Sequence, residues 1–129
     1  MLNQMNATAT IGVRDLHKAN EFYRNKLGLT PIGWDESMGF LHFKSGDATI
    51  EVYKSDFAGT NKATTLTWTV GDNIEKEVQN LKQKGISFEH YQLPEARLEG
   101  DIHVMKDMKA AWFKDPDGNI LCMHDHWVR

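Results

Sequence analysis

Three side chains in predicted strands could take part in chemistry, because they supply a carboxylate, a thiol and an imidazole. Glu51 lies in the predicted strand 48–54, and Cys122 and His124 lie in the predicted strand 119–124. Side chains alternate along a strand, so Cys122 and His124 share one face, where the imidazole could accept the thiol proton. The three groups could also act together as metal ligands. The alternative is structural: a buried cysteine is usually a small apolar residue, and His124 could cap the strand end or face solvent.

The composition is typical of one globular domain. The chain has 129 residues, of which 40% are hydrophobic, 26% charged and 10% aromatic, and its formal net charge is −3. The charges are scattered, which predicts neither a nucleic-acid partner nor a membrane partner. The single cysteine, Cys122, excludes an intrachain disulfide framework. With no recognisable secretion signal at the start of the sequence, this cysteine usage favours a cytoplasmic location.

The elements that must position these groups follow the order strand, helix, strand, strand, strand in the first half of the chain. Residues 7–13 predict a strand, Asp15 a helix N-cap, and Gly28 the end of that helix. The apolar positions at helical spacing are Leu16, Ala19, Phe22, Tyr23 and Leu27. Three further strands are predicted at 30–34, 39–44 and 48–54, with a turn at 45–47.

The second half predicts the same order. Residues 64–70 predict a strand, Asp72 a helix N-cap and Gly85 the helix end, with a helical stripe of Ile74, Val78 and Leu81. Further strands are predicted at 86–92, 108–114 and 119–124, and an Asp-Pro-Asp-Gly turn at 115–118 closes the last hairpin. The segment 94–106 is predicted to be a loop. It is either a lid with polar contacts from Arg97, Glu99, Asp101 and His103, or a surface connection.

An internal repeat relates the two halves. A shift of 57 residues superposes identical residues at five positions, among them the strand end, the helix cap and the helix stop. Val13 falls on Val70, Asp15 on Asp72, and Gly28 on Gly85. We therefore favour a duplicated unit over a chance coincidence.

The repeated element order, together with three short motifs, resembles the vicinal oxygen chelate superfamily. The motifs are Val-Arg-Asp-Leu at 13–16, Phe-Tyr at 22–23 and Trp-Phe-Lys-Asp-Pro-Asp-Gly-Asn at 112–119. This superfamily contains glyoxalase I, fosfomycin-resistance thiol transferases, extradiol dioxygenases and bleomycin-resistance proteins, and the likeness covers about residues 6–125. It implies an α+β fold of two βαβββ modules, 6–55 and 63–125, whose curved mixed sheets surround a cleft within a single domain, 1–129. It also implies a homodimer.

The resemblance further implies where a divalent metal would bind. The metal enzymes of the superfamily take ligands from four strand positions, which here hold Thr8, Glu51, Thr65 and Cys122. Only Glu51 is a usual ligand type at its position. Neutral threonine hydroxyls are poor donors, and a catalytic metal needs about three good protein ligands. We therefore predict no cofactor and no metal site, although Glu51, Cys122 and His124 leave a non-standard ligand set open.

Strand alternation separates a polar face from an apolar one. If Glu51 faces the cleft, Ile50 and Val52 pack beneath the helices. The same phase gives the predicted ligand-binding residues Thr8, Thr10, Glu51, Tyr53, Thr65, Thr67, Trp112, Cys122 and His124, and Trp34, Phe40 and His42 could add to the wall. Such a surface suits an amphipathic organic molecule. The alternative is that the threonines merely fill strands, for which they have good propensity.

Three functions compete on this basis. The first is a metal-independent protein of the bleomycin-resistance type, which binds a small amphipathic molecule or an antibiotic as a homodimer. The second is an enzyme, either a metal-dependent lyase or isomerase or a dioxygenase, with a non-standard ligand set that includes Glu51. The third is a structural or regulatory domain with a vestigial cleft. One fold hosts such different activities, so the sequence leaves the choice open.

Overall fold

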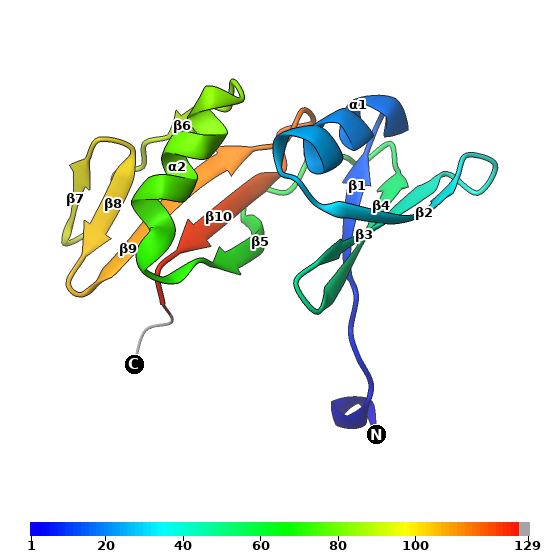
Figure 1. The fold of residues 1–129 in the computed structure, drawn as a ribbon, viewed down its shortest axis with the longest axis horizontal. Helices are drawn as coiled ribbons and strands as arrows, with labels where there is room; N and C mark the ends of the chain where they lie inside the picture. Colours follow the sequence, from blue (N-terminus) through cyan, green and yellow to red (C-terminus); the bar gives the residue numbers. More distant parts are fainter. Residues whose placement is uncertain (127–129) are drawn as a thin grey trace. The chain divides into compact units, whose positions relative to one another are not determined.

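A computed structural model describes residues 1–126 of the chain, which divides into two compact units (Figure 1). Unit 1 is Met1–Thr60 and unit 2 is Asn61–Arg129. Each unit contains a strand followed by a helix, and then the remaining strands of an otherwise mainly antiparallel sheet; in unit 1 a short 3₁₀ turn precedes the first strand. No helix within residues 1–126 combines the length and apolarity needed to cross a membrane.

Unit 1 is a four-stranded sheet with a helix on one face (Figure 1). Its elements are η1 (Leu2–Gln4), β1 (Ala9–Val13), α1 (Leu16–Asn20), η2 (Glu21–Lys26), β2 (Thr30–Asp35), β3 (Phe40–Ser45) and β4 (Ala48–Lys54). The strand order is β1-β4-β3-β2, with β1 parallel to β4 and the other pairs antiparallel. The predicted strands of this half are confirmed to within two residues at each end.

The helical segment of unit 1 begins and ends where its sequence predicts. The Asp15 carboxylate accepts hydrogen bonds from the backbone N–H groups of His17 and Lys18, which otherwise lack partners in the first helical turn. Gly28 follows the helix at φ +76°, a conformation that costs glycine little. Between them α1 widens into η2, one turn of π-helix, and the consecutive residues Phe22 and Tyr23 are both buried.

The core of unit 1 lies between the sheet and this helical segment. The buried strand residues are Ile11, Val13, Leu41, Phe43, Ile50 and Val52. They meet Leu16, Ala19, Phe22 and Tyr23 of the helical segment, and the Tyr23 and Phe43 rings lie 6.2 Å apart. Burial of these large side chains stabilises the unit by roughly 1.5–3 kcal/mol each relative to exposure. The helix therefore fixes which face of the sheet is apolar.

Unit 2 is a six-stranded sheet with a longer helix on one face (Figure 1). Its elements are β5 (Thr64–Thr69), η3 (Gly71–Asn73), α2 (Ile74–Gln83), β6 (Phe88–Glu89), β7 (Ala96–Glu99), β8 (Ile102–Met105), β9 (Met108–Lys114) and β10 (Ile120–His124). The strand order is β5-β10-β9-β8-β7, and β6 also pairs with β9. The predicted stripe Ile74, Val78 and Leu81 is buried, as are Phe113, Leu121 and Met123 of the sheet.

Three expectations for unit 2 are wrong. Asp72 does not cap α2, because an extra 3₁₀ turn, Gly71–Asn73, precedes the helix and Asn73 takes the N-cap position. The predicted strand 86–92 shortens to Phe88–Glu89. The segment 94–106 is not a loop: β7 and β8 form a hairpin whose turn contains Gly100 at φ +63°. The repeat is therefore imperfect, because this hairpin has no counterpart in unit 1.

The Asp-Pro-Asp-Gly turn between β9 and β10 is confirmed. The Gly118 N–H donates to the Asp115 carbonyl at 3.0 Å, and Gly118 adopts φ +91°. The buried Asp115 carboxylate accepts hydrogen bonds from the backbone N–H groups of Asp117 and Asn119, both at 2.9 Å, and from the Asn119 side-chain amide at 2.8 Å. This turn fixes the register that brings Trp112 opposite Cys122.

Candidate functional site

Each sheet has a face opposite its helix, which we call the helix-free face. In unit 1, Glu51 and Tyr53 lie on this face, whereas Ile50 and Val52 are buried in the core. The strand phase inferred from the sequence agrees with this arrangement. The role of these residues as ligand contacts stays a prediction.

One row of residues crosses the helix-free face of unit 1. Register places Thr10 beside Glu51, Glu51 beside His42, and His42 beside Gly33. The His42 Nε2 atom lies 3.5 Å from the Glu51 Oε2 atom, and both side chains are about one-third exposed. The Phe40 ring lies 5.0 Å from the His42 ring. This arrangement offers a carboxylate and an imidazole to solvent, which suits a polar or cationic group.

Two other residues of unit 1, Thr8 and Trp34, do not lie where the sequence predicted. Thr8 precedes β1, which begins at Ala9, so it has no strand phase, and its carbonyl accepts a 3.3 Å hydrogen bond from the Thr10 hydroxyl. Trp34 does not join the helix-free face. A register shift between Pro31 and Gly33 pairs Trp34 with the core residue Leu41, on the helix side of the sheet.

The helix-free face of unit 2 contains two rows of polar and aromatic residues. Cross-strand register places Thr67, Cys122, Trp112 and Glu89 in the first row, and Thr69, His124, Ala110 and His103 in the second. His124 is 5% exposed, and its Nε2 atom lies 2.7 Å from the Thr69 hydroxyl. The sequence analysis predicted that Thr67, Trp112, Cys122 and His124 lie on one face. The strand register brings these four residues to the same face of the sheet.

The register of β5 is irregular at its start. The shift between Ile120 and Leu121 pairs Thr64 with Ile120 and leaves Thr65 without a paired position on β10. The Trp112 Nε1–H donates a 3.2 Å hydrogen bond to the Thr64 hydroxyl, which orients the indole ring. The Thr65 hydroxyl is buried and has no hydrogen-bond partner within residues 1–126. Thr64, which was not predicted, therefore contacts Trp112.

Cys122 is not poised to act as a nucleophile. Its side chain is buried, and burial raises the pKa of the thiol from 9.0 to about 12. The Sγ atom lies 3.5 Å from the Met123 carbonyl oxygen, which accepts its proton in a weak hydrogen bond. The neighbouring His124 imidazole is engaged with Thr69. A thiol that stays protonated supports the structural interpretation of this cysteine.

Three rings gather at one end of this face, and we call Tyr91, His103 and Trp112 the ring group. Their centroids lie 4.9 Å apart for His103 and Trp112, 5.6 Å for Tyr91 and Trp112, and 6.0 Å for Tyr91 and His103. The His103 and Trp112 planes meet at 88°, an edge-to-face geometry that aromatic rings favour. The segment after β6 supplies Tyr91, β8 supplies His103 and β9 supplies Trp112, so the hairpin that the sequence did not predict completes the group.

The ring group holds polar atoms without partners. The Tyr91 hydroxyl and the His103 Nδ1 atom are buried, and neither makes a hydrogen bond of good geometry within the part of the chain that the structure describes, although the Ala110 backbone lies close enough to the His103 ring to oppose the lowering of its pKa. A pocket of about 200 Å³ beside them is lined by Tyr91, Gln92, Leu93, Ala96, Arg97, Leu98 and His103. Buried polar groups normally have partners, so these two atoms are candidates for contact with a ligand or a water molecule.

Hydrogen bonding and burial determine the protonation states of His103 and Tyr91 in the ring group. The Tyr91 backbone N–H donates to the His103 Nε2 atom at 2.9 Å, so a neutral His103 has its proton on Nδ1. Burial lowers the pKa of His103, which keeps the ring neutral near pH 7. Burial also raises the pKa of Tyr91, and the Glu89 carboxylate adds to the shift. The site therefore offers two neutral hydrogen-bond donors.

The lowered pKa of His103 predicts a pH dependence of stability. The unfolded chain binds a proton at His103 more readily than the folded one, so protonation favours unfolding. Stability is full above the ordinary histidine pKa and falls as the pH drops below it, by at most about 1.4 kcal/mol per pH unit for one group. We expect His103→Gln to reduce this fall between about pH 7 and 5, measured by urea unfolding. The exposed His17 of unit 1 provides the control, since it has no part in the pKa shift of His103 and His17→Gln leaves that contribution in place.

Tyr91 and His103 were not identified together from the sequence. His103 was considered only as a polar residue of a lid, but it is 1% exposed and lies between the buried residues Ile102 and Val104. The apolar positions on both sides of His103 were the available signal for a strand. Nothing in the sequence around Tyr91 indicates that its backbone would meet a histidine 12 residues later.

The two units define a mixed α+β protein with two mainly antiparallel sheets, each with a helix on one face. A family model for the Glyoxalase/Bleomycin resistance protein/Dioxygenase superfamily matches residues 4–123. The chain belongs to this superfamily. Its resemblance to the vicinal oxygen chelate fold, inferred from the sequence motifs, is thereby confirmed.

Individual relatives agree with this assignment. The protein YraH of Bacillus subtilis (strain 168) is 30% identical over 122 residues, which cover 84% of this chain and 88% of YraH. An integron cassette protein from the mobile metagenome of Halifax Harbour sewage outfall has a TM-score of 0.72 at 18% identity, over 95% of this chain and 99% of that one. The fosfomycin resistance protein FosX of Listeria monocytogenes, complexed with Mn(II) and sulfate, has a TM-score of 0.70 at 15% identity, over 95% and 90% of the two chains.

The residues at the superfamily's metal-ligand positions do not fit a divalent metal. Glu51 supplies a carboxylate, but Thr8 and Thr65 supply neutral hydroxyls, and the Cys122 thiol has a pKa of about 12. Within either unit, no group of three or more His, Cys, Asp or Glu side chains among residues 1–126 could hold a metal ion. We therefore derive no reaction step through a metal.

Proposed function

We propose that the protein binds a small amphipathic organic molecule without a metal, at the helix-free face of unit 2. The observation that carries the proposal is the pair of buried donors without partners, the Tyr91 hydroxyl and the His103 Nδ1–H, beside a pocket of about 200 Å³. An acceptor oxygen of a ligand would satisfy both donors, which otherwise remain desolvated at a cost of about 1–3 kcal/mol each.

The surroundings of these donors define the rest of the ligand. The rings of Tyr91 and Trp112 offer flat apolar surface, and Ala96 and Leu98 line the adjacent pocket. The pocket volume of about 200 Å³ accommodates only one end of a drug-sized molecule. The ligand we propose therefore has a compact end with a hydrogen-bond acceptor and a flat apolar body that lies against Trp112. Thr67, Cys122 and His124 extend the same face.

Binding rather than catalysis follows from the absence of an activated group at this site. The Cys122 thiol stays protonated at neutral pH, His103 is neutral and buried, and Tyr91 has a raised pKa. Polar groups in this state orient a ligand but supply neither a nucleophile nor an efficient general base near pH 7. A protein that only sequesters its ligand needs no such group.

A thermal-shift titration with bleomycin, an amphipathic antibiotic, tests the proposal. A ligand at 100 times its dissociation constant stabilises a protein by about 2.7 kcal/mol. We expect Tyr91→Phe to weaken binding about five- to tenfold, because it removes one donor to the ligand. The same substitution leaves the stability of the free protein intact, since the hydroxyl has no hydrogen bond to lose within residues 1–126.

The control for this titration is His17→Gln, which alters an exposed histidine of unit 1 outside the pocket. No stabilisation by bleomycin, or by a library of amphipathic aromatic metabolites used in the same way, contradicts the proposal. Equal affinity of the wild type and Tyr91→Phe for a ligand that does bind contradicts the proposed site.

The second candidate function is a metal-dependent reaction at unit 1. It is favoured by the 3.5 Å approach of His42 and Glu51 and by the Mn(II) complex of FosX, a structural relative. Fosfomycin with Mn(II) is the probe for this alternative, and loss of the antibiotic measured by phosphorus NMR would support it.

A second copy of the chain is part of the proposal. We expect a homodimer, with twice the 14.8 kDa chain mass in light scattering.

A further inference from the structure

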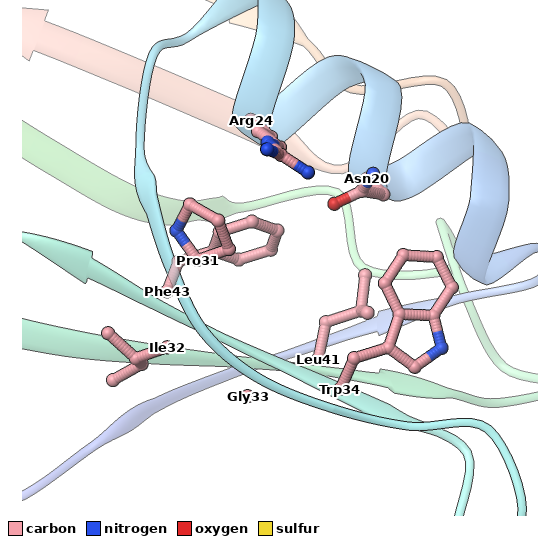
Figure 2. A pocket seen from close by; sticks show the side chains of 8 residues that line it. All are labelled: Asn20, Arg24, Pro31, Ile32, Gly33, Trp34, Leu41 and Phe43. Atoms are coloured by element: carbon pink, nitrogen blue, oxygen red, sulfur yellow. The ribbon is translucent and has the colours of Figure 1, made fainter.

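A second pocket lies in unit 1, on the helix side of the sheet and away from its helix-free face. It has a volume of about 310 Å³, within the range in which small ligands bind. It is lined by Asn20, Arg24, Pro31, Ile32, Gly33, Trp34, Leu41 and Phe43 (Figure 2). The helical segment forms its roof, β2 forms one side, and β3 forms the floor.

The roof of this pocket offers two polar side chains. Asn20 and Arg24 are four residues apart, so they lie on the same side of the helical segment. Figure 2 shows both side chains extending from the helical ribbon toward β2. Neither side chain has a hydrogen bond or ion pair within residues 1–126. Glu36, an acidic residue two positions after Trp34, is paired with His17 instead: its Oε1 atom lies 2.6 Å from the His17 Nε2 atom.

The rest of the pocket is apolar and aromatic. Leu41 and Phe43 of the floor are 1% and 0% exposed, so they are fixed by the core. The Trp34 side chain is 43% exposed and rises from β2 toward Asn20 (Figure 2). Its ring lies 5.2 Å from the His17 ring, which positions the indole as a wall.

The irregularity of β2 keeps this pocket open. The register shift between Pro31 and Gly33 leaves Ile32 without a paired position on β3, and Pro31 has no N–H to donate. β2 is also the edge strand of its sheet, so no further strand covers the pocket within unit 1.

We infer that this pocket binds a small aromatic carboxylate. Its carboxylate group pairs with the Arg24 guanidinium, which binds planar anions through two parallel hydrogen bonds, and the Asn20 amide donates a further one. Its ring lies on the apolar floor against Trp34. The site is independent of the proposed site on unit 2, because the two share no residue.

Phenylacetate, phenylacetamide and phenethylamine test the inference, because they share one ring and differ in charge. Each is titrated into ¹⁵N-labelled protein up to about 10 mM, which detects millimolar dissociation constants. We expect phenylacetate to shift the indole N–H signal of Trp34, with binding at least about tenfold tighter than that of the amide or the amine. The Tyr91 and Trp112 signals of unit 2 stay unchanged.

Two substitutions locate the charge that attracts the ligand. Arg24→Gln removes the guanidinium and is expected to weaken phenylacetate binding about tenfold or more. Lys18→Gln removes a positive charge from α1 outside the pocket lining and serves as the matched control, with unchanged affinity. The inference is overturned if phenylacetate shifts no signal of the pocket, if the three compounds bind equally, or if Arg24→Gln binds as tightly as the wild type.

Discussion

Iodoacetamide is expected to modify Cys122 about 1,000-fold more slowly in the native protein than in the unfolded chain, at neutral pH. The thiolate is the reacting form, and burial raises the pKa of Cys122 from 9.0 to about 12. Each unit of pKa lowers the thiolate population about tenfold under these conditions. The measurement is the rate of mass increase with and without denaturant.

The control for this experiment moves the thiol to the surface. Ser37 is exposed in the turn after β2, so Ser37→Cys combined with Cys122→Ser presents a solvated thiol in a folded protein. We expect this variant to react nearly as fast as the unfolded chain. If native Cys122 reacts within about tenfold of the unfolded rate, its thiol is accessible as a nucleophile or a metal ligand. The enzymatic alternative would then regain support.

Asp115→Ala is expected to lower the free energy of unfolding by about 3 kcal/mol. The Asp115 carboxylate is buried and accepts three hydrogen bonds from Asp117 and Asn119. Removing the carboxylate leaves those donors without an acceptor, and each unsatisfied buried donor costs about 1–3 kcal/mol. The loss also loosens the β9–β10 hairpin that sets the register of Trp112 against Cys122. Urea unfolding of the two proteins measures the difference.

Asp35→Ala is the matched comparison for this change. The Asp35 carboxylate also accepts hydrogen bonds across a tight turn, from the Ser37 hydroxyl and the Met38 N–H, but both bonds are exposed. Water can replace the lost acceptor there, so we expect a clearly smaller effect. Equal losses for Asp35→Ala and Asp115→Ala would show that burial is not what makes the Asp115 turn important.

Local signals explain the parts of the fold that the sequence predicted well. Asp15 caps its helix, Gly28 and Gly85 end theirs with positive φ, and the turn at Asp115 forms as expected, because each depends on neighbouring residues only. The alternation around Glu51 also predicted its face, since a buried strand face must be apolar. These features need no knowledge of distant contacts.

Two of the failures have a common physical origin in strand register. Trp34 lies on the helix side because of a one-residue shift in β2, and Thr65 falls at a similar shift in β5. A slip of one residue moves a side chain to the other face, and nothing in the local pattern marks it. The β7–β8 hairpin was missed although its pairings are local: Glu99 pairs with Ile102 and Met105 with Met108, each across a two-residue turn, and the segment 94–106 was interpreted as a loop.

The ring group shows the same limit for function. Trp112 was predicted to line the site from its place in a motif, but its partners Tyr91 and His103 come from segments whose structure was predicted incorrectly, a strand at 86–92 and a loop at 94–106. The unit 1 pocket was not anticipated either, because it depends on the register shift of β2 and on the side of the helix that bears Arg24.

The most direct test of the central claim is a calorimetric titration of bleomycin into protein treated with a chelator. The ring group contains no metal ligand set, so we predict binding that is unchanged by excess chelator and weakened about five- to tenfold by Tyr91→Phe. The contradictory result is binding that disappears with the chelator and returns with one equivalent of Mn(II). That outcome would place a metal at the centre of the protein's function.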